Sequence, residues 1–161
     1  MKSLVVYDSA YGNTATIGQA IAAALGSEVQ AGLVGAEARF ELGSLDLLVV
    51  GSPTQGGRPT AAIQAFLSTI PPNALQNTVV AAFDTRFAPQ ARGLGLPLLM
   101  RLIGFVAPRI ARQLQDKGGQ LAVSPEGFIV TGKEGPLKSG EAEHATAWAQ
   151  LLLALHPSVK V

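Results

Sequence analysis

The chain has 161 residues, of which 48% are hydrophobic, and this is enough for one domain with a full core. It contains no cysteine, which excludes disulfides, cysteine–zinc sites and iron–sulfur clusters. The two histidines, His144 and His156, fit a solvated helix residue and a helix-terminal residue, so we expect no metal site and no Ser–His catalytic unit. Any demanding chemistry would then come from a bound organic cofactor.

The charges are unevenly spread, although the net charge is only +1. Residues 58–112 carry six arginines against a single acid, Asp84. Such a basic segment is either a solvated face or a docking site for an acidic partner or an anionic ligand. The first apolar run stops at Asp8, and no later apolar run reaches the roughly 18 residues of a membrane span. We therefore expect no secretion signal, no membrane span and a cytoplasmic location.

Apolar runs typical of strands alternate with helical patterns along the whole chain. Strands are predicted at 2–7, 28–33, 45–50, 78–83 and 120–130, the last interrupted at 124–127, and helices at about 14–25, 60–69, 107–117 and 140–155. Near-continuous apolar strands indicate a parallel sheet that helices cover on both faces. The expected fold is a single α/β domain over residues 1–161, a three-layer doubly wound sandwich with a five-stranded parallel sheet in the order 2-1-3-4-5.

Three loops would open at the carboxyl ends of these strands, where such sheets bind ligands: residues 9–14, 51–59 and 84–90. The first loop joins small hydroxyl and amide residues to a helix N-terminus, which predicts a phosphate site built without Lys or Arg. It lacks the Gly-Lys-Ser/Thr of a nucleotide triphosphatase loop and the three spaced glycines of a dinucleotide loop. The alternative is an ordinary helix cap by Asn13 or Thr14.

The other two loops carry groups suited to a flat polar ligand. In the second loop, paired glycines at 56 and 57 allow a close backbone approach and a peptide flip, and the alternative is a glycine-rich turn that feeds a helix capped by Thr60. The third loop, Phe83 to Phe87, offers aromatic, carboxylate, hydroxyl and guanidinium groups. Its alternative is a surface pair of Asp84 and Arg86, with Phe87 packed in the core.

Together, the three loops resemble those of flavodoxins. The stretch from Tyr7 to Gly18 matches the family's N-terminal pattern, except that Gly18 stands where Ala is usual, a change expected to weaken the helix by about 1 kcal/mol. The resemblance covers essentially the whole chain and implies non-covalently bound FMN, with the phosphate on the first loop and the isoalloxazine between residues 53–58 and 84–87. The implied cofactor-binding residues are Ser9, Ala10, Tyr11, Gly12, Asn13, Thr14, Ser52, Pro53, Thr54, Gln55, Gly56, Gly57, Arg58, Asp84, Thr85, Arg86 and Phe87.

The aromatic residues depart from the flavodoxin pattern. Flavodoxins usually flank the ring with Trp or Tyr, but the only tryptophan, Trp148, falls in the last predicted helix and suits the core. Tyr11, Phe83 or Phe87 would then cover the ring, or one face would stay open. Weaker stacking implies a weaker affinity for FMN and room for a substrate.

The charge also departs from the pattern, since flavodoxin carriers are usually strongly acidic and this chain is near neutral. We expect Arg58 or Arg86 to lie near the flavin and to stabilise its anionic reduced form. Replacement of either arginine by Gln would then lower the reduction potential.

The third departure is an apolar segment punctuated by Gly and Pro, residues 88–106, where short flavodoxins have a few residues. It is either a short extra helix on the domain's own core, a homodimer surface through 94–105, a partner patch, or a lid over the flavin. A peripheral contact with a membrane is a further alternative.

The function implied by the resemblance is electron transfer by an FMN-binding protein that meets a redox protein partner. One alternative is an FMN-dependent NAD(P)H:quinone-type oxidoreductase, and another is an interaction domain of the same fold that no longer binds FMN. A flip of the peptide between Gly56 and Gly57 would offer either an N–H or a C=O to the flavin N5 as the protonation of that atom changes. We expect no nucleic-acid partner, because the arginine cluster has no interleaved aromatic residues.

Overall fold

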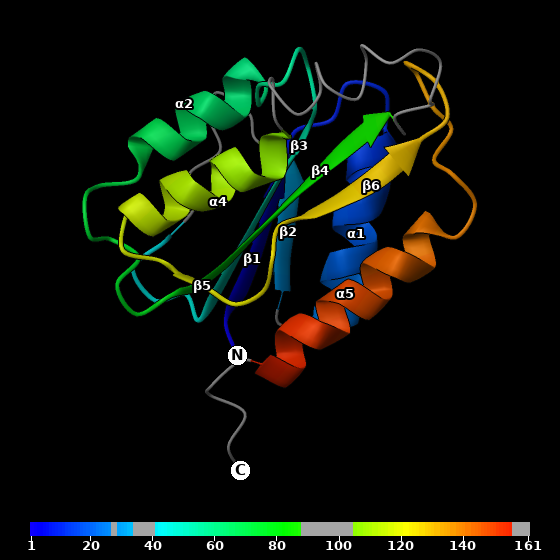
Figure 1. Ribbon diagram of the computed structural model, residues 1–161. Coiled ribbons are helices and arrows are strands. Elements are labelled where there is room, and N and C mark those ends of the chain that lie inside the picture. The colour runs from blue at the N-terminus through cyan, green and yellow to red at the C-terminus, as the bar shows by residue number, and fades with distance from the viewer. Residues whose placement is uncertain (27–28, 34–40, 88–104, 156–161) are drawn as a thin grey trace.

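The computed structural model describes residues 1–26, 29–33, 41–87 and 105–155. Strands and helices alternate along these residues (Figure 1). The elements are β1 (Ser3–Tyr7), α1 (Asn13–Leu25), β2 (Val29–Leu33), β3 (Leu47–Pro53), α2 (Ala61–Thr69), β4 (Val79–Phe87), α4 (Val106–Asp116), β5 (Gln120–Leu121), β6 (Glu126–Val130) and α5 (Glu141–Leu155).

The strands form one parallel sheet in the order β2-β1-β3-β4, with β5 and β6 both paired to β4. The predicted order 2-1-3-4-5 is confirmed, with its fifth position divided between two short strands. The chain winds in opposite directions from β1 and β3, so the switch point lies between these two strands. Because every pair is parallel, the carboxyl ends of β1, β3, β4 and β6 meet at one edge of the sheet.

Strand β3 continues through Pro53, beyond the predicted 45–50 and into the predicted second loop. Two further predicted boundaries were wrong. Strand β4 continues through Phe87, so residues 84–87 are strand and not loop, because β6 pairs with β4 from Phe83 to Phe87. The predicted break at 124–127 lies earlier, since β6 already begins at Glu126. Pairing with a neighbouring strand extends both segments, and local composition does not record it.

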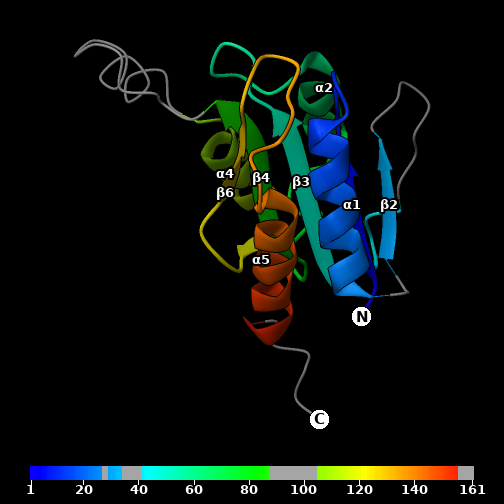
Figure 2. The same ribbon diagram turned by 90° about the vertical axis from the view of Figure 1, so that its right-hand side faces the viewer.

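Helices cover both faces of the sheet, as predicted. Helices α2 and α4 pack on one face, against side chains that include Leu48 and Val80. Helices α1 and α5 pack on the other, against Val49 and Phe83, and lie in front of the strands in Figure 2. Thr60 caps α2, as the sequence indicated, with its hydroxyl accepting from the Ile63 N–H at 3.4 Å.

The only tryptophan is a core residue, as expected. Trp148 is 5% exposed and contacts Phe83 and Phe128 edge-on, at ring-centroid distances of 6.4 and 6.2 Å. It is therefore out of reach of a ligand at the carboxyl edge. No helix in the described ranges has the length and hydropathy that crossing a bilayer needs.

Candidate functional site

A cavity of about 410 Å³ opens at the carboxyl edge of the sheet, between the ends of β1, β3, β4 and β6. Its size is typical of a small-molecule site. The residues that line it are Ala10, Tyr11, Asn13, Thr14, Pro53, Thr54, Gln55, Gly56, Thr85, Arg86, Phe87, Val130 and Lys133. All but Val130 and Lys133 belong to the predicted set, so segments far apart in the sequence meet here as expected.

The first loop is capped by Ser9. Its hydroxyl accepts from the backbone N–H groups of Gly12 at 3.1 Å and Ala15 at 3.2 Å, which leaves the Ser9 O–H free to donate. Gly12 has φ +89°, a conformation that favours glycine, and helix α1 begins directly after it. The alternative of a cap by Asn13 or Thr14 was wrong, because Gly12 is the N-cap residue and the Ser9 hydroxyl accepts from the Ala15 N–H in the first turn.

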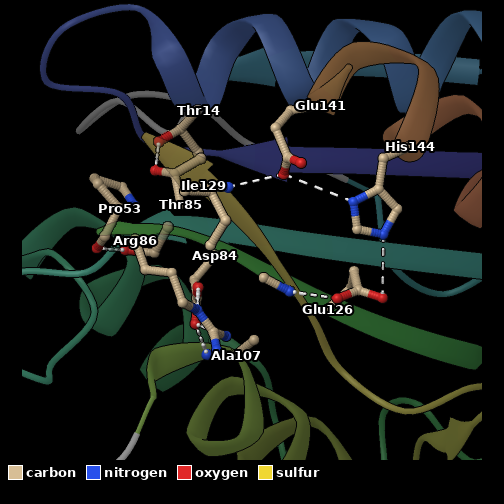
Figure 3. Close-up of polar contacts among 12 residues, drawn as sticks. Thr14, Pro53, Asp84, Thr85, Arg86, Ala107, Glu126, Ile129, Glu141 and His144 are labelled. Carbon is tan, nitrogen blue, oxygen red and sulfur yellow. Dashed lines mark hydrogen bonds and ion pairs between the residues drawn. The ribbon is translucent and has the colours of Figure 1, made fainter. Parts of the chain in front are cut away.

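The start of α1 keeps backbone donors for an anion. Within the described residues, the N–H groups of Asn13 and Thr14 have no acceptor. The two side chains are engaged elsewhere: Asn13 Nδ2 donates to the Glu134 carbonyl at 3.1 Å, and the Thr14 hydroxyl lies 2.8 Å from that of Thr85 (Figure 3). The helix N-terminus therefore offers unpaired backbone N–H groups at the cavity.

The second loop is a tight turn. Gln55 and Arg58 exchange backbone hydrogen bonds of 3.2 and 3.1 Å, and the two glycines between them have φ +56° and +75°. Positive φ at both central positions is typical of a type I′ turn, for which glycine is suited. The turn brings Gly56 to the cavity wall and leaves Gly57 and Arg58 outside it.

Two hydroxyls at the end of β3 have different roles. Ser52 is fully buried, where its hydroxyl accepts from the Thr60 N–H at 3.0 Å and donates to the Pro53 carbonyl at 2.9 Å. It shapes the second loop and does not line the cavity. Thr54 does line it, and its Oγ1 is a buried atom without a partner in the described structure. Such an orphaned hydroxyl fits a ligand that supplies the missing hydrogen bond.

The structure directs Asp84 to α4 and not to the cavity wall. It is fully buried and accepts from Arg86 through both carboxylate oxygens, with Nη2 to Oδ2 at 2.8 Å, and from the Ala107 N–H at 2.8 Å (Figure 3). Burial raises the pKa of Asp84 above its usual 3.8, while Arg86 and the N–H groups that begin α4 oppose the increase. Asp84 thus joins β4 to α4 and does not line the cavity.

Arg86 is held on three sides. Besides its pair with Asp84, its Cζ lies 3.7 Å from the centroid of the Phe105 ring. On the β6 side, a Cβ at position 127 would come within 2.5 Å of Arg86 Nη2, so the guanidinium occupies the space that Gly127 leaves. The sequence offered a surface pair of Asp84 and Arg86 as an alternative interpretation. The two residues do pair, but inside the protein and not on its surface.

The exposed aromatic residues of the cavity are Tyr11 and Phe87, at 50% and 47% exposure. Phe83, the third aromatic candidate, is fully buried in the core. Phe87 was placed in the core by the alternative prediction, which was wrong because β4 carries this side chain to the cavity.

Sequence reasoning missed Val130 and Lys133, which follow the last strand. The phosphate site was predicted without Lys or Arg, yet a lysine lines the cavity. The signal was present: Gly-Lys-Glu-Gly-Pro after an apolar strand predicts a turn, and a turn after a parallel strand lies at the same edge as the other three loops.

Several predictions fall outside the described residues. These are the alternatives for the apolar segment at 88–104, including the homodimer surface, and the role of His156. Among the residues that the structure describes, no three His, Asp or Glu side chains form a group that could hold a metal ion.

Comparisons with known proteins agree with this fold. A family model for the flavodoxin domain matches residues 4–92, more than half of the chain. No curated protein matches the chain.

Solved structures show the same fold. Flavodoxin 2 from Bacillus cereus superposes with a TM-score of 0.73 at 19% identity, over 96% of this chain and 99% of that one. A flavodoxin from the domain Archaea gives 0.70 at 19% over the full length of both, and a WrbA-like flavodoxin from Agrobacterium tumefaciens gives 0.66 at 20% over 95% and 96%. From the family match together with this fold, the chain belongs to the flavodoxin family.

Proposed function

We propose that the chain binds FMN non-covalently in this cavity and transfers electrons to and from a redox partner. The observation that carries the proposal is the cavity itself, which joins a helix N-terminus with free N–H groups to two exposed aromatic side chains. One end suits a phosphate and the other suits a flat ring.

At the phosphate end, the backbone N–H groups of Asn13 and Thr14 and the Ser9 hydroxyl supply donors. The partial positive charge of the α1 N-terminus adds to them. The side chains of Asn13 and Thr14 also hold neighbouring segments in place, through the Glu134 carbonyl and the Thr85 hydroxyl.

At the ring end, Tyr11 and Phe87 present aromatic surface, and the second loop presents main chain from Pro53 to Gly56. The Thr54 hydroxyl, which is buried and has no partner in the described structure, would hydrogen-bond to a polar atom of the ligand. Glycine at both central positions of the turn lets its peptide present either N–H or C=O towards the ring. The cofactor, when bound, supplies reversible electron exchange, and the chain contributes position and electrostatics.

The side chains that line the cavity suit an electron carrier better than an enzyme that uses acid–base catalysis. Within the described residues, the cavity is lined by no carboxylate and no histidine, and Tyr11 is its only phenol. The three similar structures reported above all carry the name flavodoxin, which supports the same choice. For the partner, we propose an acidic protein, because Arg58 beside the cavity and Arg112 on α4 are both exposed.

A quinone-reductase activity is the second candidate. The half-exposed Tyr11 and Phe87 favour it, because they leave apolar surface on which a flat substrate can stack. Oxidation of NAD(P)H with a quinone acceptor separates the two functions: a carrier shows turnover near the background rate, and a reductase shows sustained turnover.

The first test is an absorbance spectrum of the pure protein, followed by titration of apo-protein with FMN while flavin fluorescence is recorded. We expect flavin bands and stoichiometric quenching. Phe87→Ala is expected to weaken FMN binding by about fivefold, through loss of roughly 1 kcal/mol of ring contact.

The matched control is Leu151→Ala, which removes a side chain of the same 47% exposure from α5, outside the cavity wall, and leaves the affinity unchanged. Absence of flavin bands and of quenching at tens of micromolar FMN, on the order of a weak site, contradicts the proposal and supports the interaction-domain alternative.

A further inference from the structure

Two cationic side chains line the cavity in the described part of the chain, Arg86 and Lys133. The charge of Arg86 is already engaged, because its guanidinium pairs with both oxygens of Asp84 and packs over Phe105. A second anion would have to compete with a buried carboxylate for the same donors. Arg86 is therefore a structural cation of the cavity wall.

Lys133 differs in that its side chain is exposed and takes part in no ion pair among the described residues. It occupies the second position of a turn that Gly135 N–H closes onto the Gly132 carbonyl at 3.0 Å. Below the turn, the Thr131 N–H and hydroxyl both donate to the Pro136 carbonyl at 2.9 Å. The lysine thus extends from a well-anchored loop, which lowers the entropic cost of placing its charge.

The same turn is docked on the start of α1. Asn13 Nδ2 donates to the carbonyl of Glu134, the residue that follows Lys133, at 3.1 Å. A Cβ at position 135 would come within 2.6 Å of Asn13 Oδ1, so Gly135 permits this close contact. The lysine and the free N–H groups of the α1 N-terminus consequently belong to one end of one cavity.

We infer that Lys133 is a specificity-determining residue of this site, which binds the phosphate of the flavin and selects FMN over riboflavin. The inference rests on the proposed function. A helix N-terminus offers partial charge and directed donors, whereas the ammonium group supplies a full charge that a phosphate dianion attracts. An uncharged ribityl hydroxyl at the same place gains little from a lysine. The turn between β6 and α5 then becomes a fourth binding segment, beside the three loops seen in the sequence.

The test compares Lys133→Gln with the matched control Lys138→Gln, which removes an exposed lysine of the same loop outside the cavity wall. Apo-protein of each variant is titrated with FMN and with riboflavin, at low salt and at about 0.5 M salt. We expect Lys133→Gln to weaken FMN binding by about five- to tenfold at low salt, and by less at high salt because ions screen an exposed charge. Riboflavin affinity stays unchanged, Lys138→Gln behaves as wild type, and Lys133→Arg restores most of the FMN affinity.

Two results for the variant overturn the inference while the proposed function stands: an unchanged FMN affinity, or an equal loss for FMN and riboflavin, which would show that Lys133 only shapes the loop. A wild-type protein that binds neither flavin overturns the proposed function and this inference together. The wild-type titration therefore separates the two kinds of failure.

Discussion

Gly18 lies in the middle of α1 against the ring of Tyr7, and a Cβ there would come within 2.6 Å of Tyr7 Cε1. By helix propensity alone, this glycine is a weak point of the helix. In the fold, it is the place where a buried ring on β1 meets the backbone of α1. The residue that departs from the flavodoxin pattern is therefore required by its neighbour.

Gly18→Ala is the sharpest test of this packing, because the two arguments differ in sign. Propensity predicts a gain of about 1 kcal/mol, whereas overpacking predicts a loss of about 1–3 kcal/mol. We expect the loss, measured by urea unfolding, and a smaller loss in a Tyr7→Leu background. The control is Gly43→Ala, since no atom lies within 4 Å of a Cβ at that position. A stabilised Gly18→Ala protein would show that the ring moves aside at little cost.

The pKa of Asp84 likewise depends on the residues that surround it in the fold. Because burial raises its pKa above 3.8, the folded state holds this proton more tightly than the unfolded chain does. The contribution of Asp84 to stability therefore rises as the pH falls from the raised pKa towards 3.8, and is lost as the pH rises through this window.

Urea unfolding of the wild type and of Asp84→Asn at several pH values from 7 to about 4 tests this sign. We expect the free energy of unfolding of the wild type to increase relative to that of the variant as the pH falls. A relative decrease would mean that the pairing with Arg86 outweighs burial and lowers the pKa.

Among the elements, the start of α5 is tied to β6 by a small polar cluster. Glu141 Oε2 accepts from the Ile129 N–H at 2.8 Å and lies 3.6 Å from His144 Nδ1, while His144 Nε2 lies 3.5 Å from Glu126 Oε2 (Figure 3). His144 also packs on the Phe128 ring, at a centroid distance of 4.9 Å. This cluster holds β6 and the start of α5 together, and these are the two ends of the loop that carries Lys133.

Glu141→Ala is expected to cost about 1–3 kcal/mol of unfolding free energy, because it leaves the Ile129 N–H without its acceptor. Glu141→Gln keeps a carbonyl acceptor and should cost less. Glu143→Ala is the control, since it removes an exposed acid from the same first turn of α5 and so the same favourable charge near the helix N-terminus. Equal losses for Glu141→Ala and Glu143→Ala, measured by thermal and urea unfolding, would assign the effect to helix charge alone.

For the whole molecule, the parallel topology brings the ends of four strands and the start of α1 to one cavity. A ligand there contacts segments from both halves of the chain and binds only when they are assembled. Such a ligand stabilises the fold as a whole by mass action.

FMN at about 100 times its dissociation constant should therefore stabilise the protein by about 2.7 kcal/mol, which corresponds to a rise in Tm of roughly 5–10 °C. Thermal unfolding of apo-protein with and without FMN measures this shift. Riboflavin at the same concentration should give a smaller shift, because it lacks the phosphate. Equal Tm values with and without FMN contradict a site that is built from the assembled sheet edge.

The strand order, the helices to within a residue or so, and most of the cavity wall could be predicted from the amino-acid sequence alone. Local patterns suffice for these, because buried parallel strands are apolar throughout and parallel topology sends their ends to one edge. The sequence also indicated the role of Thr60 and the burial of Trp148, which follow from nearby residues.

Which side chains at that edge face the cavity depends on how the strands pair and pack. Asp84 and Phe87 stand in one five-residue run, yet pairing with β6 makes that run a strand, whose alternate side chains point to opposite faces. Asp84 is thereby directed to the face that α4 covers and Phe87 to the opposite face. Arg86 shares the face of Asp84 but lies nearer the end of the strand and still lines the cavity, a division that composition does not contain. Lys133 reaches the same cavity because its turn docks on Asn13, and a contact between residues so distant in the chain is set by packing rather than by any local pattern.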